Sequence, residues 1–214
     1  MVFGNASAWS TGLRDVHEEV MAAILRVWPR VTRHFSPTAD EDSITDQLVL
    51  EIQRDVEGRQ KWLIQREHEL FATDSKGKVI TKPAIDIVIF FTLEQRLYLA
   101  YECKRLRVVF SSGFRHLADR YVDEGMMRFL VGKYAPGLLF GTMLGYVMDS
   151  NVDSAFQNVC DAICQREVTL CCNKTVETLS AAGAMKRMRT VHNIKKLGES
   201  PFTMHHGLLP LAGC

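Results

Sequence analysis

Residues 83–106, PAIDIVIFFTLEQRLYLAYECKRL, form two apolar runs that carry charged side chains. Asp86 stands in the first run, and Glu102 and Lys104 stand in the second. Both runs are rich in Ile, Val, Phe and Tyr, a composition that predicts two β-strands. Because an unpaired buried charge is strongly unfavourable, the three side chains indicate a site of chemistry that holds a counter-charge, for which a divalent metal is the natural candidate.

The two strands are predicted over 84–91 and 96–106, with a short hairpin turn between them. Residues two apart on a strand lie on one face of a sheet, so Glu102 and Lys104 share a face. If the strands pair through the short turn, Asp86 lies near Glu102 on the neighbouring strand. We therefore expect two carboxylates and an amine to lie together.

Hydrophobic periodicity around these strands predicts the remaining elements. Helices are expected over 13–28, 43–55, 114–130 and 152–163, with Ser43 as the cap of the second, and further strands over 62–71, 138–147 and 202–211. Turns are expected at 74–78 and 92–95, and the strand at 202–211 is expected at an edge. The order predicts an α/β fold: a mixed central sheet of four to five strands flanked by helices.

Composition places the chain among globular proteins. Its 214 residues are 47% hydrophobic and 24% charged, which excludes disordered and fibrous classes and fits a single domain. No apolar run approaches the roughly 20 residues of a membrane span, and the first residues lack the pattern of a signal peptide. We therefore expect a cytoplasmic protein with no membrane partner.

The cysteines show neither the spread of a disulfide framework nor a paired C-x-x-C zinc spacing. They are Cys103, Cys160, Cys164, Cys171, Cys172 and Cys214. Reduced thiols that pack as small buried hydrophobic groups are the favoured interpretation. The alternative is a metal site that combines Cys160 and Cys164 with the later cysteines or with His205 and His206.

The net charge of +1 conceals an uneven distribution of charge along the chain. Residues 40–57 are mainly acidic, whereas residues 184–198 are basic and contain no acid. Two interpretations of the basic segment stay open: a solvated or flexible face, and a patch in which Lys186, Arg187 and Arg189 contact phosphates.

The order of the elements, with Pro83-Ala84-Ile85-Asp86 on the second strand and Glu102-Cys103-Lys104 on the third, resembles the PD-(D/E)XK nuclease superfamily, which has the restriction-endonuclease-like fold. The resemblance covers roughly residues 40–165 as a nuclease core of helix, three strands, helix and strand. Residues 1–39 are then an N-terminal helical extension, and residues 166–214 are a C-terminal extension with the basic segment.

The resemblance implies a role for each matching residue. Asp86, Glu102 and the Cys103 backbone carbonyl would bind one or two Mg²⁺ ions, with Mn²⁺ as a possible substitute, and Lys104 would position or deprotonate the attacking water. Hydrolysis of an anionic phosphodiester requires charge neutralisation and a polarised water whatever the family. Hard carboxylates suit Mg²⁺ better than thiolates do.

The superfamily often adds one more acid. The candidates are Glu41, Asp46, Glu51, Glu67 and Glu69. We favour Glu41, at the start of its helix, although the helix dipole also explains an acid there. Arg120 and Tyr121 are candidates for contact with the substrate backbone, and the favoured interpretation of Tyr121 is a core aromatic residue.

Three functions follow. The first is a Mg²⁺-dependent nuclease, for which DNA is a better candidate substrate than RNA. The resemblance to the superfamily also implies a homodimer, a targeting protein partner and a role in restriction or phage defence. The second is a catalytically weak nucleic-acid-binding or assembly module of the same fold. The third is a regulatory subunit that uses residues 152–170 and the cysteine-rich tail as an interface.

A purely structural interpretation of the three central residues is also open. In it, Glu102 and Lys104 form a salt bridge on a solvated sheet face, and Asp86 lies at the rim of that face.

Overall fold

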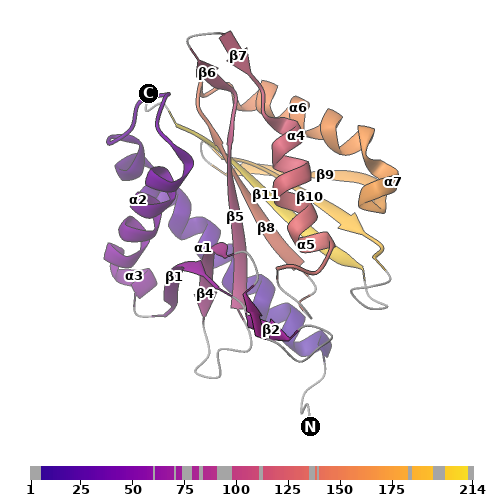
Figure 1. The fold of residues 1–214 in the computed structure, drawn as a ribbon. Helices are drawn as coiled ribbons and strands as arrows, with labels where there is room; N and C mark the ends of the chain where they lie inside the picture. The colour runs from indigo at the N-terminus through magenta and orange to yellow at the C-terminus, as the bar shows by residue number, and fades with distance from the viewer. Residues whose placement is uncertain are drawn as a thin grey trace.

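A mixed β-sheet runs through the molecule and carries helices on both faces (Figure 1). The structure is a computed structural model that describes residues 6–59, 61–69, 71–73, 79–81, 84–90, 98–110, 113–134, 138, 140–182, 185–194 and 201–211. The predicted turns at 74–78 and 92–95 lie outside these residues.

Seven strands form the main sheet within the described residues. Their spatial order is β1 (Leu63–His68), β4 (Ile85–Phe90), β5 (Tyr98–Leu106), β8 (Phe140–Val147), β11 (Phe202–Pro210), β10 (Met185–His192) and β9 (Cys172–Ala182). Strands β5, β8 and β11 run parallel, and the other neighbouring pairs are antiparallel. The α/β class and the mixed sheet are confirmed, whereas the expected four to five strands were too few because β9 and β10, which were not predicted, join the same sheet.

The prediction that the strand at 202–211 lies at the edge of the sheet is wrong. Strand β11 lies inside the sheet, hydrogen-bonded to β8 on one side and to β10 on the other. It buries apolar side chains on both faces, since Met204 and Leu208 join one core and Leu209 joins the other. Parallel strands covered by helices on both faces are usually apolar throughout, which explains this pattern.

Two small hairpins project from the main sheet. One pairs β2 (Phe71–Thr73) with β3 (Val79–Thr81), and the other pairs β6 (Val108–Phe110) with β7 (Gly113–Arg115). The strand predicted over 62–71 is therefore two strands, because β1 ends at His68 after Glu67 adopts a left-handed φ of 51°.

Helices α1 (Ala6–Thr32), α2 (Glu41–Arg54) and α3 (Val56–Arg59) form one layer. The predicted first helix is confirmed, although α1 continues through Pro29. Ser43 does not cap α2: Asp40 is the N-cap, and its side chain accepts a hydrogen bond from the Ser43 backbone N–H at 2.8 Å. The correct cap lies three residues earlier because the carboxylate of Asp40 can reach that N–H from outside the helix.

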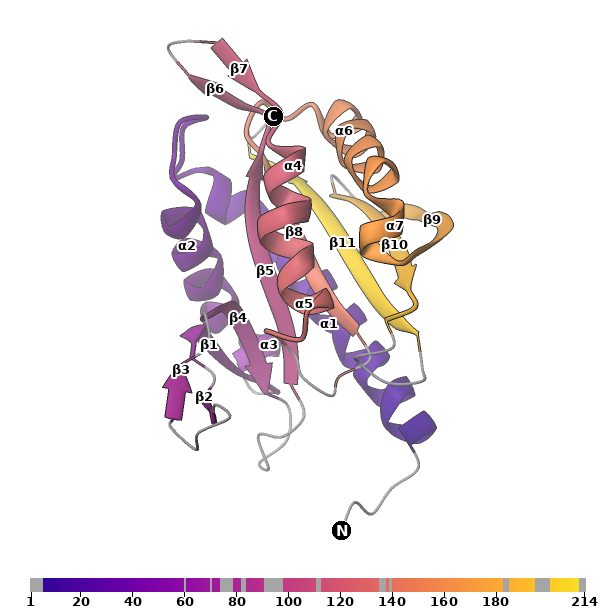
Figure 2. The same ribbon diagram turned by 45° about the vertical axis from the view of Figure 1, so that its right-hand side comes forward.

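The other face of the sheet carries a short helical rod and two further helices (Figure 2). They are α4 (Ala118–Arg120), the π-helical turn η1 (Tyr121–Met126), α5 (Met127–Leu130), α6 (Val152–Gln165) and α7 (Glu167–Leu170). The helix predicted from residue 114 begins four residues later, because residues 113–115 are paired in β7 and Leu117 has a left-handed φ of 56°. No helix in the described ranges is both long enough and apolar enough to cross a membrane.

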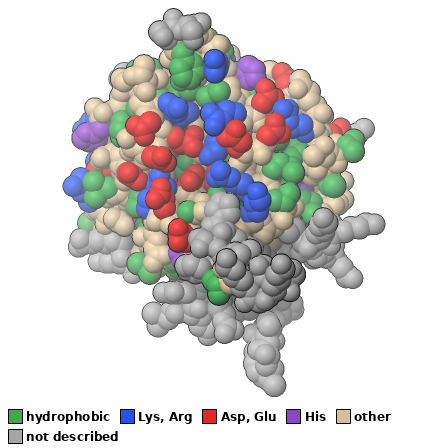
Figure 3. Space-filling view, in the orientation of Figure 1, with side chains coloured by type: hydrophobic (Ala, Val, Ile, Leu, Met, Phe, Trp, Pro, Cys, Tyr) green, Lys and Arg blue, Asp and Glu red, His purple; other side chains and the backbone are tan. Residues whose placement is uncertain are grey.

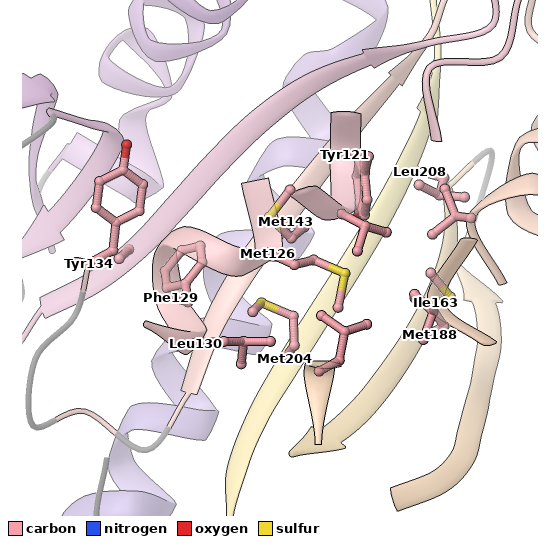
Figure 4. Packing of buried hydrophobic residues seen from close by; sticks show 14 of the residues in the cluster. Tyr121, Met126, Phe129, Leu130, Tyr134, Met143, Ile163, Met188, Met204 and Leu208 are labelled. Atoms are coloured by element: carbon pink, nitrogen blue, oxygen red, sulfur yellow. The ribbon is translucent and has the colours of Figure 1, made fainter. Parts of the chain in front are cut away.

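Each face of the sheet has its own hydrophobic core. The core under η1, α5 and α6 packs Tyr121, Met126 and Phe129 against Met143 of β8 and Met204 of β11 (Figure 4). The core under α1 and α2 packs residues such as Ile24, Leu48, Tyr101 and Leu144. Because both faces of β5 are covered, any charged side chain on this strand is held in a largely buried environment.

Candidate functional site

Asp86, Glu102 and Lys104 lie together on the face of the sheet that carries η1 and α5. Strands β4 and β5 pair in the register that sets Ile87 opposite Tyr101, which brings Asp86 beside the segment at 102–104. The Asp86 carboxylate accepts a hydrogen bond from the Cys103 N–H at 2.7 Å. The Lys104 ammonium lies 2.8 Å from the Glu102 carboxylate. The structure therefore brings together the three residues that the sequence predicts to meet.

The site is buried rather than solvated. The Glu102 side chain is 0% exposed and that of Lys104 is 11% exposed. Asp86 retains a partly open side chain, at 19%. The alternative predicted a salt bridge between Glu102 and Lys104 on a solvated sheet face: the ion pair is present, but its solvated setting is wrong, since a fully buried carboxylate forgoes all of its hydration.

Glu41 is the acid from the preceding helix that reaches the site. One of its carboxylate oxygens lies 2.9 Å from Lys104 Nζ, and the other accepts a hydrogen bond from the Arg105 N–H at 2.8 Å. Glu41 is the first residue of α2, so the Asp40 cap that begins the helix also sets its position.

The other candidate acids lie elsewhere. Asp46 pairs with Arg66, and Glu51 pairs with Arg30 and Arg54. Glu67 and Glu69 are exposed. Among the described candidates, Glu41 alone contacts Lys104.

Arg128 is a member of the site that the sequence pattern does not predict. Its guanidinium Nη1 lies 2.7 Å from Glu102 Oε1 and 2.8 Å from the Tyr134 hydroxyl, which in turn donates to the Ala84 carbonyl at 2.6 Å. Arg128 is thereby tied to β5 and, through Tyr134, to the residue that precedes β4. Periodicity placed it on the predicted helix at 114–130 but gave no signal that it faces Glu102.

Arg66 is a second cation near the site that the sequence pattern does not predict. It binds Asp42 and Asp46 of α2 at 2.9 and 2.8 Å, and its Nη1 lies 4.0 Å from the Asp86 carboxylate. The side chain is only 16% exposed. Arg66 therefore fastens α2 to β1 beside the site and adds positive charge near Asp86.

Burial and neighbouring charges shift the protonation equilibria of the site. Burial, with the nearby Asp86 charge, raises the pKa of Glu102 to about 7. Burial also raises the pKa of Asp86, although Lys104 and the Cys103 N–H oppose the shift. For Lys104, burial lowers the pKa, but the carboxylates of Glu102, Glu41 and Asp86 outweigh it and raise the pKa above its ordinary value. Lys104 is therefore a stable cation at neutral pH.

The carboxylate and carbonyl oxygens of the site are the kind of ligand that a hard divalent cation prefers. The Glu102 Oε2 atom is buried and has no hydrogen-bond partner in the described part of the chain, as expected of an oxygen that can accept a further cation. In the described residues, no three His, Cys, Asp or Glu side chains converge as a ready metal cluster. Instead, Lys104 Nζ lies between Glu41 and Glu102 and also donates to the Cys103 carbonyl at 2.7 Å.

The predicted phosphate-contacting residues lie away from this site. Lys186 pairs with Asp153 at 2.6 Å, and Arg187 pairs with Glu18 of α1 on the opposite face of the sheet from Glu102. Both lie on β10, so the described part of the basic segment is a sheet strand rather than a flexible face. Arg189 is half-buried on the same strand, and Arg120 pairs with Glu124 at 2.8 Å. Their binding of nucleic acid stays a prediction.

The described cysteines are all free thiols. Cys103 is buried, but Cys164 and Cys171 are exposed, so the prediction of buried small side chains holds only in part. No cysteine cluster that could hold a metal occurs among the described residues. Cys214 lies outside them.

Tyr121 is a core residue, as the favoured interpretation expected. It is fully buried, and its hydroxyl hydrogen-bonds to His206 Nδ1 at 2.9 Å. It opens the π-helical turn η1, which packs against β5. Such turns are rare and often occur near functional sites, and here the turn brings Gly125 to the Lys104 stem.

Comparison of the chain with protein-family models, curated proteins and solved structures finds no match.

Proposed function

We propose that this protein is a metal-dependent nuclease that hydrolyses phosphodiester bonds, with DNA as its favoured substrate. One observation carries the proposal: a buried lysine lies within 3 Å of the carboxylates of Glu41 and Glu102, beside Asp86, on adjacent strands of a mixed sheet (2.9 and 2.8 Å). Several charged groups buried together in a core usually destabilise the folded state, and such clusters are common at active sites. The element order of the resembling superfamily, helix, three strands, helix and strand, is compatible with α2, β1, β4, β5, the rod of α4 to α5, and β8.

The residues divide the work by their chemistry. Asp86, Glu102 and the Cys103 carbonyl would hold Mg²⁺, which when bound neutralises the phosphate and acidifies a water. Lys104, kept protonated by its neighbours, orients that water and stabilises the negative charge that develops on the phosphorus oxygens. A raised pKa makes Lys104 a poor general base, so we assign it electrostatic stabilisation rather than deprotonation.

Glu41 and Arg128 act as positioning residues. Glu41 fixes the Lys104 ammonium from α2, and Arg128 holds the Glu102 carboxylate from α5. These contacts limit the motion of the Lys104 ammonium and the Glu102 carboxylate. A side chain held from two elements keeps the geometry that a reaction requires.

The test is a nuclease assay on linear, circular and single-stranded DNA and on RNA, with Mg²⁺, Mn²⁺ or EDTA. We expect cleavage that EDTA abolishes, and a loss of about 100-fold or more in Asp86→Asn and in Lys104→Met, because each change removes charge stabilisation in the reaction. Asp161→Asn, at an exposed position of α6, is the control and retains the wild-type rate.

The outcome against the proposal is equally sharp. Cleavage that survives EDTA, or full activity in both variants, rules out this site as the nuclease centre. Unfolding curves of each variant distinguish loss of chemistry from loss of fold.

A second candidate is a nucleic-acid-binding or assembly module without strong catalysis. It is favoured by the pairing of Glu102 Oε1 with both Lys104 and Arg128, since cations of the protein already satisfy this oxygen at 2.8 and 2.7 Å. Binding of nucleic acid without cleavage in Mg²⁺ and Mn²⁺ would favour this candidate. The homodimer, the targeting partner and the phage-defence role stay predictions of the resemblance.

A further inference from the structure

The β6–β7 hairpin projects from the end of the strand that carries the candidate site. It follows β5 directly, is closed at its base by the Arg107 N–H to His116 carbonyl bond of 3.0 Å, and pairs Val109 with Phe114. Figures 1 and 2 both show it standing out beyond the sheet. At no more than about 3.6 Å per residue, Val109 lies within about 18 Å of Lys104.

The hairpin exposes apolar side chains that a folded protein normally buries. Val109 is 48% exposed, Phe110 37% and Phe114 47%. In the described part of the chain, these two phenylalanines are the only aromatic residues among the large exposed hydrophobic side chains. In the ladder of the hairpin, Phe114 shares a face with Val109, and Phe110 shares the opposite face with Arg115, so each face presents one exposed ring.

The charge of the hairpin points to the chemistry of its partner. Residues 105–118 contain Arg105, Arg107, Arg115 and His116 and no Asp or Glu. The Arg107 guanidinium lies 4.7 Å from the centre of the Phe114 ring, and that of Arg115 lies 5.3 Å from the centre of the Phe110 ring. Hydrophobic and basic side chains accordingly gather on this projection in the space-filling view (Figure 3).

The two arginines differ in their availability. Arg107 is bound at 2.8 Å to Asp149, which anchors the base of the hairpin to the end of β8. Arg115 is exposed and forms no ion pair within the residues described. A free guanidinium stacked on an exposed ring can contact a phosphate while the rings contact bases.

We propose that the β6–β7 hairpin is a stacking platform for unpaired nucleobases of the nucleic acid that reaches the Lys104 site. This inference rests on the proposed function and assigns its substrate class: nucleic acid with a single-stranded segment. The flat faces of bases are open to aromatic stacking only where the strand is unpaired. Apart from the Arg107–Asp149 pair at its base, the hairpin carries arginine and no acid, which suits a polyanion.

The test is fluorescence anisotropy with a labelled single-stranded 20-mer and a blunt 20-base-pair duplex, in EDTA so that binding is measured without hydrolysis. The main variant is Phe110→Leu with Phe114→Leu, which keeps hydrophobic bulk but removes the rings. Stacking of each base is strong enough that we expect the variant to bind the single strand at least about tenfold more weakly. Binding of the duplex should change by less than about twofold.

Two further variants sharpen the result. Arg115→Gln should reduce the slope of log affinity against log salt by about one unit for single strands, as expected when one phosphate contact is lost. Val168→Ala, at an exposed position on α7, is the control and should bind as wild type does. Matching urea unfolding curves verify that all variants are folded.

Several outcomes overturn the inference. The first is that wild type and the leucine variant bind the single strand equally, and the second is that wild type binds no single strand. The third is that wild type self-associates, that the leucine variant still does so, and that Phe110→Ala with Phe114→Ala abolishes the self-association. The last result makes the hairpin a contact between copies of the chain. Base stacking without metal-dependent cleavage refutes the nuclease proposal but leaves the platform, so the two failures are distinguishable.

Discussion

Two opposing effects act on the charged form of Glu102: burial disfavours it, and neighbouring cations favour it. Glu102 is fully buried, one of its oxygens binds both Lys104 and Arg128, and its other oxygen has no partner within the described residues. The two cations offset the loss of hydration, yet burial still raises the pKa of Glu102 to about 7. The carboxylate is therefore held at the boundary between its neutral and charged forms.

This shift predicts a pH dependence of stability. The carboxyl of Glu102 titrates near 7 in the folded protein and near 4.5 in the unfolded chain, so the folded state holds a proton that the unfolded state releases. Stability from this group is complete below pH 4.5 and is lost as the pH rises through 7. We expect the free energy of unfolding of wild type, relative to Glu102→Gln, to fall by on the order of 3 kcal/mol across this range.

Urea denaturation in EDTA of both proteins at several pH values measures the difference. The buried histidines His17, His205 and His206 have lowered pKa values and act in the opposite direction, but they are present in both proteins and cancel. A difference that stays constant between pH 4.5 and 7.5 contradicts the assigned shift.

At the scale of elements, the rod of α4, η1 and α5 determines where Arg128 stands. The rod is positioned by Phe129, which packs fully buried against Gly141 at the start of β8. A Cβ atom at residue 141 would lie 2.5 Å from two ring atoms of Phe129, a distance that neither group can accept without moving. Glycine at this position lets the rod approach the sheet closely.

Gly141→Ala is therefore expected to lower the free energy of unfolding by about 1–3 kcal/mol, the usual range for overpacking a core. It should also weaken cleavage, since moving Phe129 displaces the neighbouring Arg128 from Glu102. Gly12→Ala is the matched control: it lies in α1 with nothing within 4 Å of the added methyl group, and it should stabilise by about 0.4–1 kcal/mol. Urea denaturation measures both, and equal effects would refute the packing argument.

At the scale of the molecule, β11 joins the two halves of the sheet. It lies between β8 and β10, which the chain forms earlier, so the last strand completes the interior of the sheet. A chain ending at Asn193 should therefore lack a cooperative unfolding transition, because removing β11 separates β10 and β9 from β8. Near-ultraviolet circular dichroism and thermal unfolding test this expectation. A native-like transition would show that residues 63–147 fold without β11.

The candidate site was largely predictable because its residues are close along the chain. Alternation along β5 determines that Glu102 and Lys104 share a face, and the antiparallel pairing of neighbouring strands brings in Asp86. Glu41 was a weaker prediction, since an acid at a helix start has a second explanation in the helix dipole. Arg128 and Arg66 were not predictable, because nothing in a charged residue's local pattern states which distant strand it faces.

The sequence by itself therefore determined the α/β class, most of the helices, and the meeting of two carboxylates with a lysine, since these depend on periods of 2.0 and 3.6 residues and on local pairing. The tertiary structure alone decided that the sheet has seven strands, that β11 is internal and that α5 supplies an arginine to Glu102. It also showed that the basic strand β10 pairs with acids of α1 and α6. Such features depend on which distant segments pack together, a choice made by burial over the whole chain.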